Sequence, residues 1–357
     1  MFKKIFNRPP GEPLLVFRKK RYRRAQARSE PPPPQTFKEP EQSISTLSTP
    51  SPGPATARAI KEPSRFKKFV RWYATGFLGG VGVVALLLVV LFLFPSPRLN
   101  ILVLGLDRRA AEKTYVSRTD TMILATVDPT QPYVGMLSIP RDLYLVLPSG
   151  QNGRINTAHF FAEAEAPGTG PAAALQTVRS NFGVTVNRFV RLDFAGFVKI
   201  VDAMGGVTID VPVPVSDNAY PTEDFGTQFI SFEAGPQHMD GQRALIYART
   251  RHSSSDFARA NRQQLVIQAC FNRLLQPGAW VRLPLILAAV NASVDTNLTP
   301  FDILRLAPTL LRVGPSGLDR RVIEGNMVQP NTTSSGGSVQ LPVWENINPV
   351  LKEMFGE

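Results

Sequence analysis

The chain has 357 residues, with 40 Lys and Arg against 28 Asp and Glu, 32 prolines and one cysteine. The charge is uneven, because residues 1–71 hold 17 basic and 5 acidic residues while residues 72–357 hold 23 of each. A basic tail on a charge-balanced body argues against a nucleic-acid-binding domain. The lone Cys270 excludes an intrachain disulfide, and the three histidines lack the spacing of a zinc hydrolase site.

The N-terminal tail is expected to be disordered. Residues 1–64 contain 12 prolines, including the run Pro31–Pro34, and too few apolar residues to bury a core. The basic cluster Arg18–Arg24 could bind nucleic acid or anionic lipid, but a solvated tail that reinforces membrane topology is the favoured interpretation. We therefore treat residues 1–71 as a basic cytoplasmic tail without a fold of its own.

A long uncharged segment follows the tail. No charged residue occurs between Arg71 and Arg98, and residues 74–94 are almost entirely apolar or glycine. As a helix this core would be about 31 Å long, close to the hydrocarbon thickness of a bilayer. A buried helix of a soluble protein would show a polar face, and a cleaved signal peptide would not follow such a long tail. We therefore expect a transmembrane helix within residues 72–97.

The flanks of this segment predict its orientation. Four basic residues lie within residues 65–71, directly before it, and Trp72 and Tyr73 suit the membrane interface. The excess of positive charge places the N-terminus in the cytoplasm. The protein is then a single-pass protein of the cell membrane, with residues 98–357 as an extracytoplasmic domain.

The body begins with short apolar runs rich in β-branched residues, which predict strands at residues 100–106, 121–127, 134–139, 143–147 and 207–211. Helical patterns alternate with these runs. Pro171 can open a helix that Gly183 closes, and Asp193 can cap a helix over residues 194–204. Further helices are predicted at residues 257–275, 283–290, 302–311 and 344–355, with a loop at 331–338. This alternation predicts an α/β fold, a layered α-β-α domain with a central mixed sheet.

Two carboxylates stand at predicted strand ends. Asp107 follows the run 100–106, and Asp120 precedes the run 121–127. Mg²⁺ prefers a few oxygen ligands and keeps several waters, so these two side chains could share one ion. The more ordinary interpretation of an aspartate at a strand end is a turn residue.

Seven arginines lie at the ends of apolar segments, where loops gather. They are Arg118, Arg141, Arg154, Arg249, Arg251, Arg259 and Arg262. Guanidinium groups form bidentate hydrogen bonds to phosphate oxygens, so such a set beside paired carboxylates suits a diphosphate and its metal ion. Surface salt bridges with Asp142, Asp256 and their neighbours explain the charge pattern equally well.

Three polar residues share one face of the predicted helix 257–275. Arg259, Arg262 and Gln263 fall at i, i+3 and i+4, close to a helix N-terminus, which attracts anions. The chain lacks the nucleophile elbow G-x-S-x-G, the phosphate loop G-x-x-x-x-G-K-[ST] and the zinc motif H-E-x-x-H. These absences argue against hydrolases and nucleotide-binding proteins of those classes.

Seven segments carry a resemblance to a known family. In chain order they are NILVLGLDRR at 100–109, SRTDTMIL at 117–124, SIPRD at 138–142, RIN at 154–156, DAMGGVTID at 202–210, YARTRH at 247–252 and DFARANRQQ at 256–264. This series resembles the LytR-CpsA-Psr family of cell-wall glycopolymer ligases, over residues 99–269. An N-terminal membrane anchor before an external catalytic domain is also the arrangement of that family.

The resemblance implies roles for single residues. Asp107 and Asp120 would hold Mg²⁺, or Mn²⁺ as an alternative ion. The residues that would hold the pyrophosphate are Arg118, Arg141, Arg249, Arg251, Arg259 and Gln263. Asp256 and Arg262 would order the same catalytic pocket, and Arg154 would bind substrate where the family often has lysine. The family also has a lipid-binding cavity between sheet and helices, which the apolar face of residues 257–275 could help to line, although packing explains that face equally well.

The function implied by the resemblance is a magnesium-dependent phosphotransferase. It would move a phosphoglycan from a polyprenyl-pyrophosphate carrier to peptidoglycan, so its partners would be the lipid-linked glycan, the peptidoglycan acceptor and the membrane, with no nucleic acid. Two alternatives stay open. One is a hydrolase that uses the same residues, and the other is a non-enzymatic envelope regulator that binds lipid-linked precursors.

Overall fold

The computed structural model describes residues 65–93, 96–108, 115–222, 226–250 and 256–356. Helix α1 (Arg65–Leu93) comes first, and its stretch Phe69–Leu87 is long and apolar enough to cross a membrane. None of that stretch is buried against protein. The apolar helix predicted within residues 72–97 is therefore present, although it begins earlier, at Arg65. The disorder predicted for residues 1–64 falls outside the described residues.

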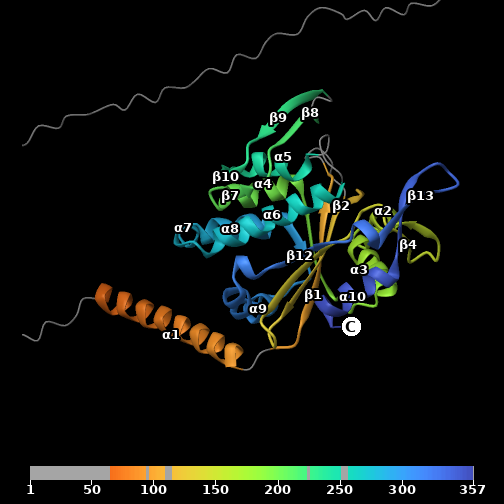
Figure 1. The fold of residues 1–357 in the computed structure, drawn as a ribbon. Coiled ribbons are helices and arrows are strands. Elements are labelled where there is room, and N and C mark those ends of the chain that lie inside the picture. Colours follow the sequence, from red (N-terminus) through yellow and green to blue (C-terminus); the bar gives the residue numbers. More distant parts are fainter. Residues whose placement is uncertain (1–64, 94–95, 109–114, 223–225, 251–255, 357) are drawn as a thin grey trace, which may run out of the picture. The chain divides into compact units, whose positions relative to one another are not determined.

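A six-stranded mixed sheet forms the centre of the domain (Figure 1). Its strands, in spatial order, are β11 (Val294–Thr296), β6 (Arg188–Asp193), β1 (Leu99–Leu106), β2 (Thr119–Asp128), β3 (Tyr133–Ser138) and β12 (Asp319–Val322). β1 runs parallel to β6 and β3 runs parallel to β12, while the other neighbours are antiparallel. The first three strands predicted from the sequence are confirmed as β1, β2 and β3.

One face of the sheet packs against two helices. Burial alternates along β1, so Leu102 and Leu104 point to the same face and are fully buried. They belong to the largest apolar cluster, together with side chains of α3 (Gly170–Phe182) and α10 (Trp344–Phe355). The positive φ of Gly183 ends α3 as predicted.

The opposite face carries α9 (Pro300–Val313) and α6 (Asp256–Leu275). Leu99 and Ile101, which alternate with Leu102 along β1, pack with Leu306 of α9. Gln264 of α6 is fully buried, and its Nε2 donates hydrogen bonds to backbone oxygens of β3 and β12. Helices on both faces confirm the predicted α-β-α layering.

A second apolar cluster lies beside the sheet. It joins α6 to α4 (Phe194–Ala203), α5 (Gly241–Arg249), α8 (Leu283–Ser293), β7 (Val207–Val211) and β10 (Gly235–Met239). At its centre the rings of Phe232 and Tyr247 meet edge to face, 5.2 Å apart. The Asp193 side chain caps α4 by accepting from the Gly196 N–H at 2.8 Å, as predicted. Because α6 packs in both clusters, it ties this lobe to the sheet.

The remaining elements are short. They are β4 (Tyr144–Val146) with β5 (Asn152–Arg154), β8 (Val215–Pro221) with β9 (Thr227–Phe232), β13 (Val328–Thr332) with β14 (Ser338–Pro342), helices α2 (Asn156–Glu165) and α7 (Pro277–Trp280), and 3₁₀ turns at Pro315–Gly317 and Gly325–Met327. The strands predicted at 143–147 and 207–211 exist, but they lie in two-stranded sheets. The loop predicted at 331–338 is wrong at both ends, because Asn331 and Thr332 pair with Val339 and Ser338. This hairpin is mostly exposed, so its polar sequence resembles that of a loop.

Candidate active site

A polar cavity of about 630 Å³ opens where β1 ends and β2 begins. It is lined by Asp107, Val116, Ser117, Arg118, Asp120, Arg141, Asp142, Arg154, Asn156, Phe160, Asp256 and Ser338. Six of the site residues predicted from the sequence are in this set, although they come from segments up to about 150 residues apart in the chain. We refer to this space as the polar cavity.

The two predicted metal ligands lie on neighbouring strands. Asp107 directly follows β1, Asp120 is the second residue of β2, and Leu106 pairs with Thr119 between them. Two hydrogen bonds join the residues that follow β1 to those that precede β2: the Asp107 N–H donates to the Arg118 carbonyl at 3.4 Å, and Ser117 Oγ donates to the Asp107 carbonyl at 2.8 Å. The β1–β2 register therefore brings both carboxylates to one cavity.

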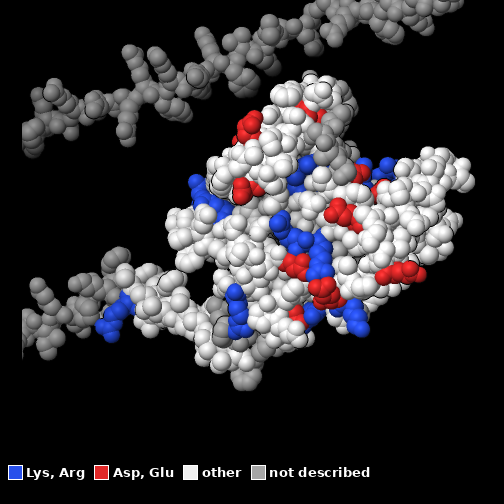
Figure 2. Space-filling view, in the orientation of Figure 1, with Lys and Arg blue, Asp and Glu red and all other residues white. Residues whose placement is uncertain are grey.

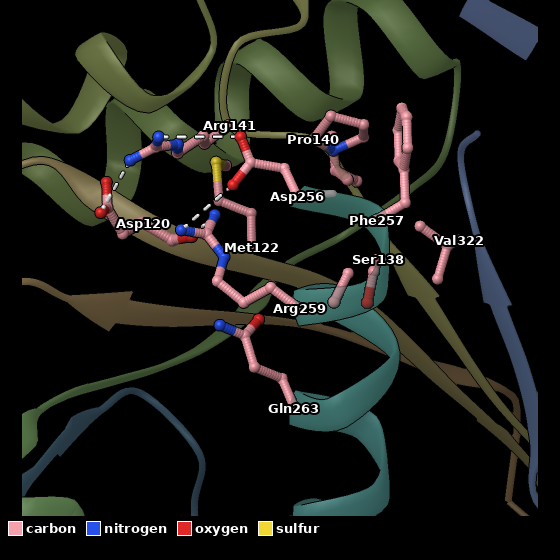
Figure 3. A pocket seen from close by; sticks show the side chains of 12 residues that line it. Asp120, Met122, Ser138, Pro140, Arg141, Asp256, Phe257, Arg259, Gln263 and Val322 are labelled. Atoms are coloured by element: carbon pink, nitrogen blue, oxygen red, sulfur yellow. Dashed lines mark hydrogen bonds and ion pairs between the residues drawn. The ribbon is translucent and has the colours of Figure 1, made fainter. Parts of the chain in front are cut away.

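A chain of ion pairs crosses the cavity wall (Figure 3). The guanidinium of Arg141 lies between two carboxylates, 2.9 Å from Asp120 Oδ2 and 3.7 Å from Asp256 Oδ2. Arg259 reaches the other oxygen of Asp256 at 3.5 Å and donates to the backbone carbonyl of Asp120 at 3.3 Å. These ion pairs join β2, the segment after β3 and α6. The salt bridges that we considered as an alternative to a phosphate site therefore exist, but they lie at the cavity and not on an open surface.

Arg249 pairs with the other carboxylate. It is the last residue of α5, and its Nη2 lies 3.6 Å from Asp107 Oδ1. The guanidinium carbon lies 4.2 Å from the ring centroid of Phe194, and Nη1 is 3.4 Å from the Tyr220 hydroxyl. The aromatic ring holds the guanidinium plane beside Asp107 by a cation–π contact.

Besides Asp256, the N-terminal turns of α6 supply three more of the predicted residues. Arg259 and Gln263 lie on the same side of the helix (Figure 3), facing a narrow pocket beside the polar cavity. Arg262 is buried and points elsewhere, because its Nη2 donates to the carbonyl of Thr250, the residue after Arg249. Burial lowers the pKa of the Arg262 guanidinium. Arg262 therefore holds the backbone of Thr250, next to Arg249, in place from within the domain.

The last three predicted arginines differ in what the structure shows of them. Arg118 is exposed and lines the polar cavity. Arg154 also lines it, and both its Nε and Nη2 donate to the carbonyl of Ser338 in β14, at 3.2 and 2.7 Å. Arg251 lies outside the described residues.

The narrow pocket beside the polar cavity is largely apolar at its base. Met122, Ile139, Phe257 and Val322 line it between the sheet and α6, and Asp120, Arg141 and Asp256 form the border that it shares with the polar cavity. Its volume is about 20 Å³, room for roughly one water molecule. This pocket is too small for a lipid chain, and the lipid-binding cavity that the resemblance implies along α6 stays a prediction.

Two residues of the polar cavity were missed as site residues in the sequence. Asp142 was interpreted as a salt-bridge partner, but it lines the cavity, and burial, followed by the nearby Asp256 charge, raises the pKa of its carboxyl group. Asn156 is buried, and its Oδ1 has no hydrogen-bond partner among the described residues. Both stand in quoted motifs, SIPRD and RIN, so their neighbours Arg141 and Arg154 could have drawn attention to them.

A buried ionic network supports the loop that carries Arg118. Arg191 of β6 is 4% exposed, and its Nη1 lies 3.0 Å from Glu163 and 3.0 Å from Nε2 of His159. Its Nη2 pairs with Asp295 at 2.6 Å. Since arginine only donates, Nε2 of His159 accepts, and the proton therefore sits on Nδ1, which donates to the Ser117 carbonyl at 3.1 Å. Neutral His159 thus links the buried arginine to the residue before Arg118.

We expect this network to make stability depend on pH. Burial, and next the Arg191 charge, lower the pKa of His159 below its usual 6.5. A lowered folded-state pKa contributes stability that is complete above the unfolded pKa and lost as the pH falls towards the folded value. In urea denaturation of the full-length chain between pH 6.5 and 5, the free energy of unfolding should fall by up to about 1.4 kcal/mol per pH unit, and His159→Asn should lack this component. An equal slope in both proteins would contradict the assignment.

The polar cavity fits a hard divalent cation. Its ionisable lining residues are four aspartates and three arginines, so an added diphosphate would need further positive charge. No group of three or more His, Cys, Asp or Glu side chains in the described residues is arranged to enclose a metal. Two carboxylates with water as the remaining ligands is the coordination that Mg²⁺ favours. Asp107 and Asp120 are suited to that role, and it stays a prediction.

Comparison with known proteins identifies the family. The model of the LytR_cpsA_psr family matches residues 95–355, nearly the whole folded domain. The chain belongs to the LytR-CpsA-Psr family. The resemblance found in the seven motifs is thereby confirmed, and it extends beyond residue 269 to the C-terminal helix. The fold agrees: the Bacillus subtilis protein TagV superposes with a TM-score of 0.57 at 24% identity, covering 73% of this chain and 98% of TagV.

Two curated relatives illustrate the family's range. The polyisoprenyl-teichoic acid–peptidoglycan teichoic acid transferase TagU of Oceanobacillus iheyensis is 32% identical over 259 residues, which cover 72% of this chain and 75% of TagU. Biofilm regulatory protein A of Streptococcus mutans is 28% identical over 258 residues, 68% of this chain and 59% of the relative. The LytR-CpsA-Psr chain described here thus resembles proteins named for a transfer reaction and one named for regulation.

Proposed function

We propose that the protein is a membrane-anchored transferase that moves a phosphoglycan from a polyprenyl-pyrophosphate carrier to peptidoglycan. The observation that carries the proposal is the polar cavity, where carboxylates and arginines from distant segments converge. The enzyme class predicted from the sequence, a glycopolymer–peptidoglycan transferase, is also the one in the name of the O. iheyensis relative.

The arginines of the site would exchange partners when substrate binds. Arg141 now neutralises Asp120, and Arg249 neutralises Asp107. Mg²⁺ held by those carboxylates, or Mn²⁺ as an alternative, would offset charge on the transferred and leaving phosphates. Arg141 and Arg249 would then be available to the diphosphate oxygens, for which a planar guanidinium provides two parallel hydrogen bonds.

The proposed reaction is a displacement at the glycan-proximal phosphorus. An acceptor sugar hydroxyl forms the new P–O bond, and the bond to the bridging oxygen breaks, so polyprenyl phosphate leaves. The hydroxyl proton needs an acceptor within the cavity. We assign it to Asp142. This carboxylate lines the cavity and, unlike Asp107 and Asp120, forms no ion pair with another described residue. Its raised pKa also improves it as a base near neutral pH.

Two other functions use the same features. A hydrolase would admit water in place of the sugar, and the polar cavity is large enough for either. An envelope regulator is favoured by the likeness to biofilm regulatory protein A, and it would depend on the basic tail more than on Asp107 or Arg249. Incubation of the full-length chain with a lipid-pyrophosphate glycan and peptidoglycan separates the three. A transferase joins glycan to peptidoglycan, a hydrolase releases it to solution, and a regulator leaves the donor intact.

The anchor and its orientation are part of the proposal. Helix α1 would cross the cell membrane once, with the basic tail in the cytoplasm and the domain outside, because positive charge precedes the span. A reporter enzyme active only outside the membrane should therefore work when fused after Glu357 and fail when fused before Arg65. The opposite pattern would overturn the orientation and remove the domain from its acceptor.

Arg249 offers a test of phosphate recognition. Arg249→Lys keeps the positive charge but loses the planar pair of donors, so kcat/KM should fall at least about tenfold, roughly 1.4 kcal/mol of transition-state stabilisation. Arg321→Lys is the matched control, because Arg321 also pairs with carboxylates, Asp319 and Glu353, away from the cavity. Equal values of kcat/KM for Arg249→Lys and the control would show that Arg249 forms only a structural salt bridge. Exposed salt bridges contribute about 0–1 kcal/mol to stability.

A further inference from the structure

Exposed apolar side chains of the domain gather in one part of the chain. Among the described residues after Ser96, fourteen large apolar side chains are exposed, and eight of them lie between Trp280 and Leu311. The eight are Trp280, Val281, Leu283, Leu285, Leu287, Phe301, Ile303 and Leu311. They belong to the segment that contains α7, α8 and α9, which lie on the same side of the central sheet (Figure 1). We call them the 280–311 surface.

Helix α8 is the clearest part of this surface. No charged residue occurs from Leu283 to Val294, and Ile286 is the buried side chain of the helix. Leu285 and Leu287 are 60% and 58% exposed. Helices on the surface of soluble proteins normally turn a polar face to water, and a contiguous apolar patch marks a contact with a partner or a membrane.

The charges around the surface select a bilayer as its partner. Residues 273–312 hold four arginines and two aspartates. Both aspartates are engaged in ion pairs, Asp295 with Arg191 and Asp302 with Arg188 and Arg305. Arg305 is therefore neutralised within the domain, and the other three arginines supply the basic charge near the surface. In Figure 2 the surface over α7 and α8 is white, with both basic and acidic atoms along its border. Apolar side chains with a tryptophan and basic neighbours suit the interface of an anionic membrane, whereas a second copy would bring like charges together.

The chain itself holds this surface near the membrane. Five residues separate Leu93, the end of α1, from Leu99, the start of β1, so the connection reaches at most roughly 20 Å. A domain of this size is roughly 45 Å across, which is more than the connection can span. Leu99 packs in the same small cluster as Leu306, Leu310 and Val313 of α9. The end of the domain that carries α9 therefore stays next to the bilayer whenever α1 is inserted.

We propose that the 280–311 surface rests in the interfacial layer of the membrane and sets the orientation of the domain above it. The inference rests on the proposed function in one respect, namely that α1 crosses the membrane. Its geometric consequence concerns α6, which begins at the polar cavity with Asp256 and ends at Leu275, next to α7. A 20-residue helix is about 30 Å long, so docking through α7 would keep the cavity end of α6 within about that distance of the bilayer.

The test uses the full-length chain in vesicles that contain an anionic phospholipid. A nitroxide label is placed at Leu285→Cys in a Cys270→Ala background, and the matched control label is placed at Val146→Cys. Val146 is a large apolar residue of β4 that is also exposed, at 52%. Electron paramagnetic resonance then compares the collision of each label with oxygen, which enters the bilayer, and with a water-soluble nickel chelate.

We expect the oxygen-to-nickel collision ratio at position 285 to exceed that at position 146 by at least about threefold, because the interface admits oxygen and excludes the chelate. Equal ratios at the two positions would overturn the proposal. Exclusion of both reagents at position 285 would also overturn it, since a second copy of the chain or another protein segment would then cover α8.

A kinetic measurement connects docking with turnover. Leu285→Ser/Leu287→Ser should raise KM for a vesicle-borne lipid-pyrophosphate donor at least about fivefold with kcat unchanged, while Val146→Ser should not, because surface changes rarely disturb the fold. The two hypotheses fail differently. A label in the bilayer without any ligation by the wild-type chain would refute the proposed function alone, whereas ligation with a fully aqueous label at 285 would refute the docking alone.

Discussion

Asp120→Ala should reduce ligation by at least about 10³-fold, because the carboxylate serves both as a proposed metal ligand and as the partner that holds Arg141. Asp107→Ala should have a similar effect through the metal and Arg249. Both variants should bind Mn²⁺, used as a spectroscopic probe of the magnesium site, at least about tenfold more weakly than the wild type. Circular dichroism should show that both remain folded, since Asp107 is partly exposed and neither side chain belongs to an apolar cluster.

Asp319→Ala is the control for these variants. Asp319 also forms an ion pair, with Arg321, but it lies on β12 and does not line the polar cavity. Its loss should leave both ligation and Mn²⁺ binding near the wild-type level. Full activity of Asp107→Ala and Asp120→Ala in chelator-treated buffer would exclude the metal role and leave the two carboxylates as partners of the arginines.

Asp142→Asn should lower kcat by about 10²–10⁴-fold, the usual contribution of a general base, while the donor still binds. The amide keeps the shape of the carboxylate but cannot accept the hydroxyl proton. In the wild type the rate should rise with pH through the pKa of Asp142, which burial places above the ordinary 3.8, and the variant should lack this acidic limb. The measurement is the pH profile of kcat for both proteins.

Asp142 could instead have a structural role only, and the pH profile of kcat separates this role from that of a catalytic base. A structural role would reduce the rate equally at every pH, and Asp142→Glu would not restore it. A catalytic base should be rescued in part by Asp142→Glu, which returns a carboxylate to the cavity. An unchanged acidic limb in Asp142→Asn would assign the proton to another group.

Strands and caps with strong local signals were predictable from the sequence. β1, β2 and β3 are apolar and β-branched because the sheet buries them, and Asp193 caps α4 through its own side chain. β6 was missed although it pairs with a strand on each side, β1 and β11. Its residues Arg188 and Arg191 pair with Asp302 and Asp295, which are buried and partly buried. A strand with neighbours on both sides therefore carries charges where the usual pattern is apolar.

The sequence motifs predicted which residues belong to the candidate site, but not all of their surroundings. Asp107 and Asp120 were placed by strand ends, and the β1–β2 register brings them together as expected. Charge pattern alone could not decide whether Arg141 and Arg249 sit at a cavity or on an open surface, because that depends on contacts between segments more than 100 residues apart. For the same reason Asp142 passed as an ordinary salt-bridge partner, since only the folded cavity reveals its burial.

Transfer of a phosphoglycan can be followed by the path of one phosphorus atom. A lipid-pyrophosphate glycan is prepared with ³²P in the glycan-proximal phosphate and incubated with the full-length chain, Mg²⁺ and insoluble peptidoglycan. We expect the label to become covalently attached to the peptidoglycan while unlabelled polyprenyl phosphate is released, and we expect Asp120→Ala to prevent both. Recovery of the label as soluble glycan phosphate, or in an intact donor, would contradict the transfer.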